Sequence, residues 1–325
     1  MTAQLIDGEA VAAAMNLETA AAAAELKAAG RPVKLVAVQV GENPASKIYT
    51  NAQKKSCDGV GIEYHLLNLP ETTSQDALAA TIDELNRDRT VNSLILQMPL
   101  PAHLDARKVQ VMISPDKDVE GMHPVNMGRL FFGGGVVAPC TPMAAVELLK
   151  RTLPDIAGKE CVVVGHSEIV GKPIAAILLQ SLNASPTVTV CHVATKDLAF
   201  HTRRADILFV ATGVSQARWL GYQRKKKAGD IPALPNLSPL IKADMLKEGA
   251  IVIDVAINRI PKALDENGNP TLDATGKPDM KTVGDVDFEA ARQKVAAITP
   301  VPGGVGSVTT AMLLKNTIAC AKAMR

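Results

Sequence analysis

Short apolar runs rich in branched aliphatic residues recur along the chain, and Ala- and Leu-rich segments separate most of them. Eight runs have the length and composition of strands, at residues 34–40, 62–69, 91–97, 160–165, 187–191, 206–211, 250–255 and 296–299. Such runs alternating with helical segments are typical of parallel strands covered by helices. The pattern predicts an α/β fold, with a doubly wound parallel sheet in the second half of the chain.

Helical segments are marked by Ala- and Leu-rich composition and by their end signals. The first is Ala-rich and ends at Gly30, a residue that suits the left-handed position after a helix. Further helices are expected at residues 44–59, 74–87, 105–113, 142–151 and 309–324, and after Pro173. Helices and strands therefore alternate over nearly the whole chain.

A tight turn follows the strand at 160–165, where Gly165, Ser167 and Gly171 precede Pro173. A strand, a small-residue turn and a helix N-terminus direct backbone N–H groups and a positive dipole end at one point, which suits a phosphate. The spacing is G-x-S-x-x-x-G, so it matches neither the common dinucleotide fingerprint nor the G-x-S-x-G nucleophile elbow. On this segment alone, a dinucleotide site and an ordinary strand-to-helix turn both remain open.

Composition narrows the functional classes. The chain of 325 residues is 47% hydrophobic and 3% aromatic, and its net charge of +2 is too balanced for an electrostatic nucleic-acid footprint. Its five cysteines are scattered and never form C-x-x-C, which argues against disulfides and a zinc site and fits a cytoplasmic protein. No apolar stretch approaches the length of a membrane span, so we expect no membrane partner. The scattered cysteines lead us to expect no bound metal.

Two segments are expected to be surface insertions. Residues 214–240 contain the only tryptophan and the basic run Arg224–Lys227, and residues 261–281 are polar and rich in Gly and Pro. The basic run is interpreted as a solvated loop, with a role near a cofactor's adenosine end as the alternative.

Ordered motifs along the chain resemble those of the methylenetetrahydrofolate dehydrogenase/cyclohydrolase family. The resemblance runs from Ile6 to the last helix, excepting the two insertions. Its motifs are Pro44-Ala-Ser-Lys-Ile-Tyr49, Gln97-Met-Pro-Leu-Pro101, Asp116-Lys-Asp-Val-Glu-Gly121, Pro139-Cys-Thr-Pro142, the Gly165–Gly171 turn, Thr189-Val-Cys-His192, Asp254-Val-Ala-Ile-Asn-Arg259, Gly284-Asp-Val-Asp287 and Thr299-Pro-Val-Pro-Gly-Gly-Val-Gly306.

The resemblance implies two α/β domains with a cleft between them. Residues 1–145 with the C-terminal helix 305–325 would form the folate-binding catalytic domain, and residues 146–304 the Rossmann-like NAD(P)-binding domain. It also implies a homodimer and two reactions. A hydride passes from 5,10-methylenetetrahydrofolate to a nicotinamide, and water then opens the methenyl product to 10-formyltetrahydrofolate.

The family's site residues map onto matching positions of this chain. The catalytic set is Tyr49, Gln53 and Gln97. The substrate-binding set is Tyr49, Gln97, Pro99, Leu100, Asp118, Glu120, Pro302, Gly303 and Gly304. The cofactor-binding set is Gly165, His166, Ser167, Ile169, Gly171, Val193, Thr212, Gly213, Ile257 and Asn258.

One departure falls on the cyclohydrolase step. The family pattern Y-x-x-x-K-x-K reads Tyr49-Thr-Asn-Ala-Gln53-Lys54-Lys55 here, so Gln53 occupies the position of the catalytic lysine. A carboxamide donates and accepts hydrogen bonds but does not titrate near neutrality. Lys54 is about 100° further round a helix and is expected to point elsewhere. We therefore expect a dehydrogenase with weak or absent cyclohydrolase activity; the alternative is a fully bifunctional enzyme in which Lys54 or water substitutes.

A second departure is Glu120, where the family has an aspartate that holds the pterin ring. Ala144, Ser307 and Val308 also replace family residues on the substrate side. These changes leave two further alternatives, a dehydrogenase for another pterin carrier such as a methanopterin and a non-catalytic folate- or nucleotide-binding paralogue.

A third departure concerns the nucleotide. NADP-using relatives have G-R-S in the turn and a serine after the C-H pair, whereas this chain has His166 and Val193. Neutral histidine is a poorer phosphate partner than arginine, and valine has no donor. We therefore favour NAD over NADP, with a protonated His166 or a lysine of residues 224–227 as the alternative route to a 2′-phosphate.

Overall fold

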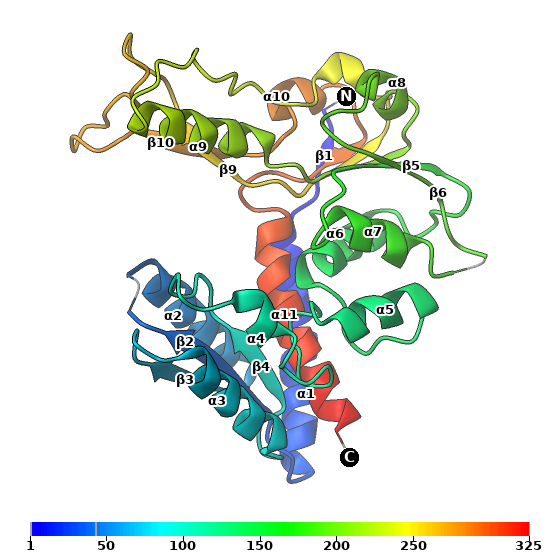
Figure 1. Ribbon diagram of the computed structural model, residues 1–325. Coiled ribbons are helices and arrows are strands. Elements are labelled where there is room, and N and C mark those ends of the chain that lie inside the picture. The colour runs from blue at the N-terminus through cyan, green and yellow to red at the C-terminus, as the bar shows by residue number, and fades with distance from the viewer. Residues whose placement is uncertain (1, 43, 182, 325) are drawn as a thin grey trace. The chain divides into compact units, whose positions relative to one another are not determined.

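The computed structural model describes residues 2–42, 44–181 and 183–324 (Figure 1). The chain divides into two compact units. The three-stranded unit comprises Ala10–Met143 with Val308–Arg325, and the six-stranded unit comprises Met1–Glu9 with Ala144–Ser307. The two parallel sheets and their covering helices confirm the predicted α/β class.

The three-stranded unit is built on a parallel sheet in the order β3-β2-β4. Its strands are β2 (Lys34–Val40), β3 (Glu63–Leu69) and β4 (Ser93–Leu96). Alternate residues of β2 face opposite sides of the sheet. Val36, Val38 and Val40 face a buried core that also contains Leu78 and Ile82 of α3 (Gln75–Arg87). The alternating valines of β2 and the aliphatic residues of β3 and β4 explain why these strands form at the predicted places.

Helices cover this sheet and complete the unit. They are α1 (Gly8–Ala28), α2 (Pro44–Val60), α3, α4 (Ala106–Gln110), α5 (Pro124–Phe132) and α11 (Val305–Ala323). Figure 1 shows α1 and α11 side by side, although they lie at opposite ends of the sequence. The Arg31 guanidinium, just after α1, donates to the carbonyl oxygen of Ala321 at 2.6 Å. The buried Asn316 of α11 donates to the carbonyl oxygens of Val119 and Ala138. The C-terminal helix thus closes the core of this unit.

The six-stranded unit contains a parallel sheet in the order β1-β11-β8-β7-β5-β6. Its strands are β1 (Gln4–Leu5), β5 (Glu160–Val164), β6 (Thr187–Cys191), β7 (Ile207–Val210), β8 (Ile251–Asp254) and β11 (Ala297–Ile298). The chain passes from β5 to β6 on one side and then returns to β7 on the other. The strand order therefore reverses at β5, and ligands of open α/β sheets bind at the carboxyl ends of strands beside such a reversal.

Helices of this unit connect the strands and cover the sheet. They are α6 (Cys140–Thr152), α7 (Gly171–Leu178), α8 (Leu198–Thr202), α9 (Val214–Lys227), the 3₁₀ helix η1 (Ala243–Met245) and α10 (Phe288–Ala291). The core holds fully buried aliphatic residues of neighbouring strands, such as Val162, Leu208 and Val252. The short α5, α8 and α10 were not predicted, because four to nine residues carry too little helical period to identify.

The two expected surface insertions pack against each other. Residues 214–227 form α9, so the basic run ends a helix and does not lie in a loop. The helix covers a two-stranded antiparallel ribbon of β9 (Asn258–Pro261) and β10 (Met280–Val283), as Figure 1 shows. Trp219 and Tyr222 are buried against Ile260 of β9. The four cations of the last turn also complement the negative end of the helix dipole.

The start of the chain departs from the predicted domain boundaries. Residues 1–9 were assigned to the first domain, but β1 pairs in parallel with β11 and belongs to the six-stranded sheet. The Gly8 N–H donates to the Gly303 carbonyl oxygen at 3.0 Å, and a β-carbon at Gly8 would clash with the Gly304 carbonyl. The Ile6-Asp-Gly8 motif therefore fits against the loop at 300–306.

Among the helices formed by residues 2–42, 44–181 and 183–324, none combines the length and the apolar composition of a membrane-spanning segment. The same ranges contain no group of three or more His, Cys, Asp or Glu side chains placed to hold a metal ion.

Candidate active site

In the three-stranded unit, α2 and the sheet bring Gln53 and Gln97 together. Gln97 follows β4 directly and is buried, and its backbone N–H donates to the Val38 carbonyl oxygen at 2.8 Å. The Gln97 Nε2 donates to the Gln53 Oε1 at 2.8 Å. Tyr49 lies one turn before Gln53 on the same face of α2 and is 70% exposed. The predicted catalytic residues thus form one amide pair with an exposed phenol on the same helix face.

Tyr64 on β3 is a further member of this group that the sequence did not indicate. Its hydroxyl donates to the Gln53 Oε1 at 3.1 Å. The strand register explains the meeting, because Leu35 of β2 pairs with both Tyr64 and Ser93. Alternation then places Tyr64 and Gln97 on the same face of the sheet. Burial, and next the nearby Cys57, raise the pKa of Tyr64 above its ordinary value, so the hydroxyl keeps its proton.

Lys54 does not occupy the place of Gln53. Its ammonium forms an ion pair with Asp58, with the Nζ 2.8 Å from Oδ2 and 3.1 Å from Oδ1. Both side chains are more than half exposed. The pair lies one turn apart along α2, as such pairs on helix surfaces commonly do. The ammonium is thus held on the outer surface of the helix, as the helical spacing predicts.

The segment with Asp118 and Glu120 lies beside β4. Leu94 pairs in parallel with Asp118, and the chain turns from there through Glu120 to Gly121, whose N–H donates to the Asp118 carbonyl oxygen at 3.3 Å. The buried Asp118 carboxylate accepts hydrogen bonds from the backbone N–H of His123 at 2.7 Å and from the Asn126 Nδ2 at 3.0 Å. These contacts fix the loop that presents Glu120. Asn126 is a second residue that the sequence did not indicate.

Glu120 differs from an exposed carboxylate in its electrostatic setting. Burial, and next the charge of Asp118, raise the pKa of Glu120 to about 7. A carboxyl group with this pKa changes its charge near neutral pH, whereas an ordinary glutamate is fully ionised there. Glu120 can therefore act either as a proton donor or as a proton acceptor near neutral pH.

The remaining predicted substrate residues are divided between the units. Pro99 is exposed after β4, while Leu100 packs partly against the core behind the sheet. Pro302, Gly303 and Gly304 lie in the six-stranded unit, where they line a cavity of about 290 Å³ together with Ile257. This cavity places one predicted cofactor residue beside the three predicted substrate residues of the loop.

In the six-stranded unit, the turn after β5 is shaped by backbone contacts. Gly165 has φ +127°, and a β-carbon there would lie 2.9 Å from the Ala211 carbonyl carbon. A β-carbon at Gly171 would clash with the Gly165 carbonyl group. The Ser167 Oγ accepts from the Val170 N–H at 3.1 Å and holds the turn at the start of α7. Close backbone approach with a helix N-terminus fits the diphosphate of a dinucleotide.

Apolar and aromatic side chains flank this turn. Ile169 after β5 and Val193 after β6 are each more than half exposed, and apolar side chains of this kind can contact a flat ring. The His166 and His192 rings stack with their centroids 4.6 Å apart and their planes 9° apart. His192 thus supports the exposed His166 at the outer side of the turn.

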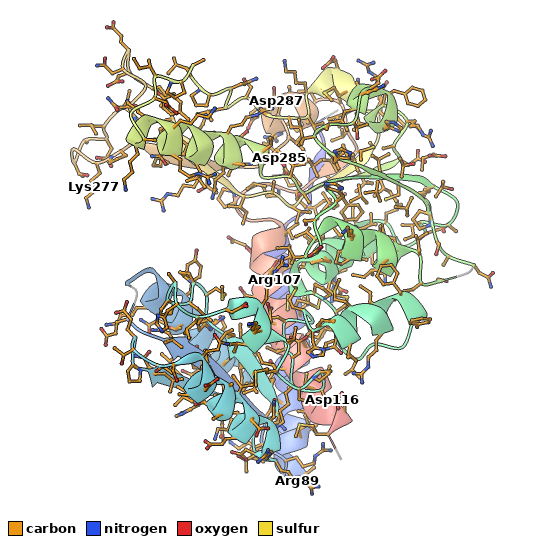
Figure 2. The ribbon with its side chains drawn as sticks, in the orientation of Figure 1. Arg89, Arg107, Asp116, Lys277, Asp285 and Asp287 are labelled. Carbon is orange, nitrogen blue, oxygen red and sulfur yellow. The ribbon has the colours of Figure 1, made fainter. Side chains whose placement is uncertain are left out.

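Asp285 contacts the other predicted cofactor residues; it lies with Asp287 on the segment that joins β10 to α10 along the chain, and both are labelled in Figure 2. Its Oδ2 accepts from the backbone N–H groups of Thr212 and Gly213, each at 2.9 Å. Its Oδ1 accepts from the Nδ2 of the fully buried Asn258 at 3.0 Å. These donors are therefore engaged within the protein, and the loop after β7 is held in place by a carboxylate that the sequence analysis gave no role.

Asp254 is a second buried carboxylate in this region. It ends β8, and its Oδ2 accepts from the Val286 N–H at 2.8 Å. A β-carbon at Gly284 would clash with this carboxylate, which explains the glycine of the Gly284–Asp287 motif. Burial, and next the charge of Asp285, raise the pKa of Asp254 to about 7.

Comparison with known proteins matches two family models to successive parts of the chain. The catalytic-domain model of the tetrahydrofolate dehydrogenase/cyclohydrolase family matches residues 6–120, and its NAD(P)-binding-domain model matches residues 139–218 and 235–325. Residues 219–234, within the α9 region, fall outside both models. The bifunctional protein FolD of Sulfurimonas denitrificans is 42% identical over 98% of each chain.

Two solved structures are similar over almost the whole chain. The FolD methylenetetrahydrofolate dehydrogenase/cyclohydrolase of Campylobacter jejuni is 39% identical, with 98% of each chain covered and a TM-score of 0.79. The Trypanosoma brucei enzyme, solved with NADP cofactor and an inhibitor, is 33% identical, with 99% and 98% covered and a TM-score of 0.79. The resemblance drawn from the motifs is confirmed, and the chain belongs to the tetrahydrofolate dehydrogenase/cyclohydrolase family.

Proposed function

We propose that the protein is an NAD(P)-dependent 5,10-methylenetetrahydrofolate dehydrogenase whose cyclohydrolase activity is weak or absent. The observation that carries this proposal is the amide pair. Gln53 stands where the family has its lysine, and it is hydrogen-bonded to Gln97. Family membership supports the dehydrogenase activity. The side chains around Gln53 support the loss of the cyclohydrolase activity.

The two reactions place different demands on these residues. Oxidation of the methylene group needs orientation of the pterin, because the bound nicotinamide supplies the hydride acceptor. Tyr49, Gln53, Gln97 and Glu120 offer a phenol, two amides and a carboxyl for that purpose. Hydrolysis of the methenyl product needs a group that accepts a proton from water and returns it. A carboxamide cannot do this near neutrality, and the Lys54 ammonium is paired with Asp58.

The turn from Gly165 to Gly171 is proposed to hold the nucleotide diphosphate. We propose NAD as the preferred form, because His166 and Val193 flank this turn where NADP-using relatives have an arginine and a serine. Stacking on His192 holds the His166 ring as a flat surface. Such a ring suits contact with a ribose or base better than bidentate pairing with a phosphate.

The decisive experiment separates the two reactions. The purified protein is incubated with methylenetetrahydrofolate and either NAD or NADP, while reduced nicotinamide and the methenyl product are followed independently. We expect both to form in equal amounts, faster with NAD, and the methenyl product to decay at the rate seen without protein. Accelerated decay would exclude the proposed loss, and a strong preference for NADP would exclude the nucleotide preference. Nucleotide binding without reduction would indicate a non-catalytic paralogue, and activity only with a methanopterin substrate would indicate the other carrier.

A fully bifunctional enzyme is the second candidate, and Glu120 favours it. This carboxyl has a pKa of about 7 and lies two residues after Asp118, which pairs with β4, so we propose it as the alternative proton relay. In that case the Glu120→Gln variant would lose methenyl hydrolysis but keep most of its hydride transfer, because its amide can still hydrogen-bond to the pterin. A matched Asp58→Asn variant, which changes only the surface ion pair of Lys54, would retain both reactions.

We also propose that the protein is a homodimer, on the strength of the family resemblance. Light scattering coupled to size exclusion would then give twice the chain mass of 34.2 kDa. A mass equal to that of one chain at micromolar concentration would contradict it.

A further inference from the structure

Tyr64 is the contact of Gln53 that the proposed function leaves unexplained. The Gln53 Oε1 receives two donors, the Gln97 Nε2 at 2.8 Å and the Tyr64 hydroxyl at 3.1 Å. A carboxamide oxygen has two lone pairs, so both are used within the protein. The oxygen end of the Gln53 amide is thereby held toward the sheet.

This arrangement fixes which end of the amide remains for a ligand. Reversing the Gln53 carboxamide would bring its NH₂ group against the Gln97 NH₂ group, donor against donor. The Tyr64 hydroxyl donates to the same oxygen, so this one orientation of Gln53 satisfies both partners. The two N–H groups of the half-buried Gln53 are therefore the end directed away from these two partners.

We propose that Tyr64 is a positioning residue that makes Gln53 a fixed, neutral hydrogen-bond donor toward a lone-pair atom of the pterin substrate. This inference rests on the proposed function and deepens it, because it assigns Gln53 a binding task in place of proton transfer. The recognised atom belongs to the class of carbonyl oxygens or uncharged ring nitrogens. An ammonium in this position would also attract anionic groups, whereas the amide selects a neutral acceptor.

The Tyr64→Phe variant tests the proposal, because it removes one hydroxyl and leaves the ring. We expect the KM for methylenetetrahydrofolate to rise about threefold to tenfold, as for loss of one net hydrogen bond, with kcat changed less than twofold. The KM for NAD is expected to stay unchanged. Tyr222→Phe is the matched control, since Tyr222 lies in the six-stranded unit against Ile260 and should leave the folate KM unchanged.

A double-mutant cycle separates positioning from a merely structural role. Gln53→Ala is expected to raise the folate KM at least as much as Tyr64→Phe, and the double variant no more than Gln53→Ala alone. Additive effects, or a lower melting temperature with an unchanged KM, would overturn the proposal. Gln53→Glu sharpens the test, because its carboxylate still accepts from Tyr64 and Gln97 but has no N–H to offer. It should therefore bind the substrate as poorly as Gln53→Ala.

Direct binding keeps this inference distinct from the proposed function. Titration calorimetry with 5-formyltetrahydrofolate, a folate that the reaction does not consume, measures affinity without turnover. If wild-type protein binds it and Tyr64→Phe binds it equally well, the positioning role is wrong while the dehydrogenase proposal stands. A second outcome is that wild-type protein binds it, that Tyr64→Phe binds it several-fold more weakly, and that neither protein reduces nicotinamide. In that case the positioning role stands and the dehydrogenase proposal is wrong. If wild-type protein does not bind it, both are wrong.

Discussion

At the turn between Gly165 and Gly171 the backbone leaves no room for a β-carbon, whereas around Gln53 the contacts are made by the ends of side chains. A turn built from backbone contacts tolerates few substitutions, because any added atom must displace a carbonyl group. A cluster built from side-chain ends can exchange one chemical group for another within the same fold. We infer that backbone geometry constrains the proposed diphosphate turn, while the side chains around Gln53 can exchange one chemistry for another.

The largest effect is expected at the backbone-built turn. In Gly171→Ala, the added β-carbon would meet the Gly165 carbonyl group, whose carbon lies 2.5 Å away. We expect NAD affinity to fall more than about 100-fold and the free energy of unfolding to fall by about 3 kcal/mol or more. Calorimetric titration with NAD and thermal unfolding measure the two quantities.

The matched control for that change is another glycine in the same unit. Gly221 lies inside α9, and a β-carbon there would have no atom within 4 Å. Gly221→Ala should therefore stabilise the protein by about 0.5–1 kcal/mol without changing NAD affinity. Normal NAD affinity in Gly171→Ala would show that the turn is not the diphosphate site.

The next effect is expected at the side-chain edge. Gln53→Lys restores the family's amine beside Gln97 and Tyr64, and we expect methenyltetrahydrofolate hydrolysis to accelerate about 100-fold, the lower range for general acid–base catalysis. The decay of the methenyl absorbance measures it. Lys54→Gln serves as the control and should change neither reaction, because Lys54 pairs with Asp58 on the helix surface. If Gln53→Lys remains at the uncatalysed rate, the loss of activity has another cause.

A smaller effect concerns Glu120 and pH. Its pKa rises from 4.5 in the unfolded chain to about 7 in the folded protein, so the folded state binds the proton more tightly. The stability contributed by this group is therefore complete below pH 4.5 and is lost as pH rises through 7. We expect Glu120→Gln to gain about 1–2 kcal/mol relative to wild type between pH 5 and pH 8, a value reduced for partial solvent screening. Denaturant unfolding of both proteins at the two pH values measures it, and a difference that does not change with pH would contradict it.

Subtracting the two unfolding curves isolates Glu120. Asp254 also has a pKa raised to about 7, and it lowers stability over a similar range in both proteins. Its contribution cancels in the difference between wild type and Glu120→Gln, because Asp254 lies in the other unit.

Much of the fold could be predicted because its main strands carry their own signal. The β-branched runs of β2, β5 and β6 identify them within one or two residues. The pairing of β1 with β11 could not be predicted, because it joins two-residue strands from opposite ends of the chain. The helix α9 was missed because its polar face hides the two aromatic residues, Trp219 and Tyr222, that anchor it.

The residues of the candidate site likewise fall into those that the sequence could predict and those that it could not. Gly165 and Gly171 follow from local chain geometry, and Gln53 and Gln97 were found by matching motifs. Tyr64 carried no motif, since its contact depends on the packing of α2 over the face of β3 and β4. A residue whose role comes from a neighbour on another element leaves no local pattern in the sequence.

The smallest effect is expected at His166, the exposed side chain that we propose influences nucleotide choice at this turn. His166→Arg keeps a flat group that can stack on His192 and adds a charged fork able to pair with a 2′-phosphate. We expect the ratio of kcat/KM for NADP to that for NAD to rise about fivefold, worth roughly 1 kcal/mol, a typical value for one partly exposed charged contact. His166→Gln, which removes the ring without adding charge, should leave this ratio unchanged. If both variants shift the ratio equally, the charge at residue 166 does not select the nucleotide. The backbone shape of the turn would then determine the choice of cofactor as well as the binding of the diphosphate.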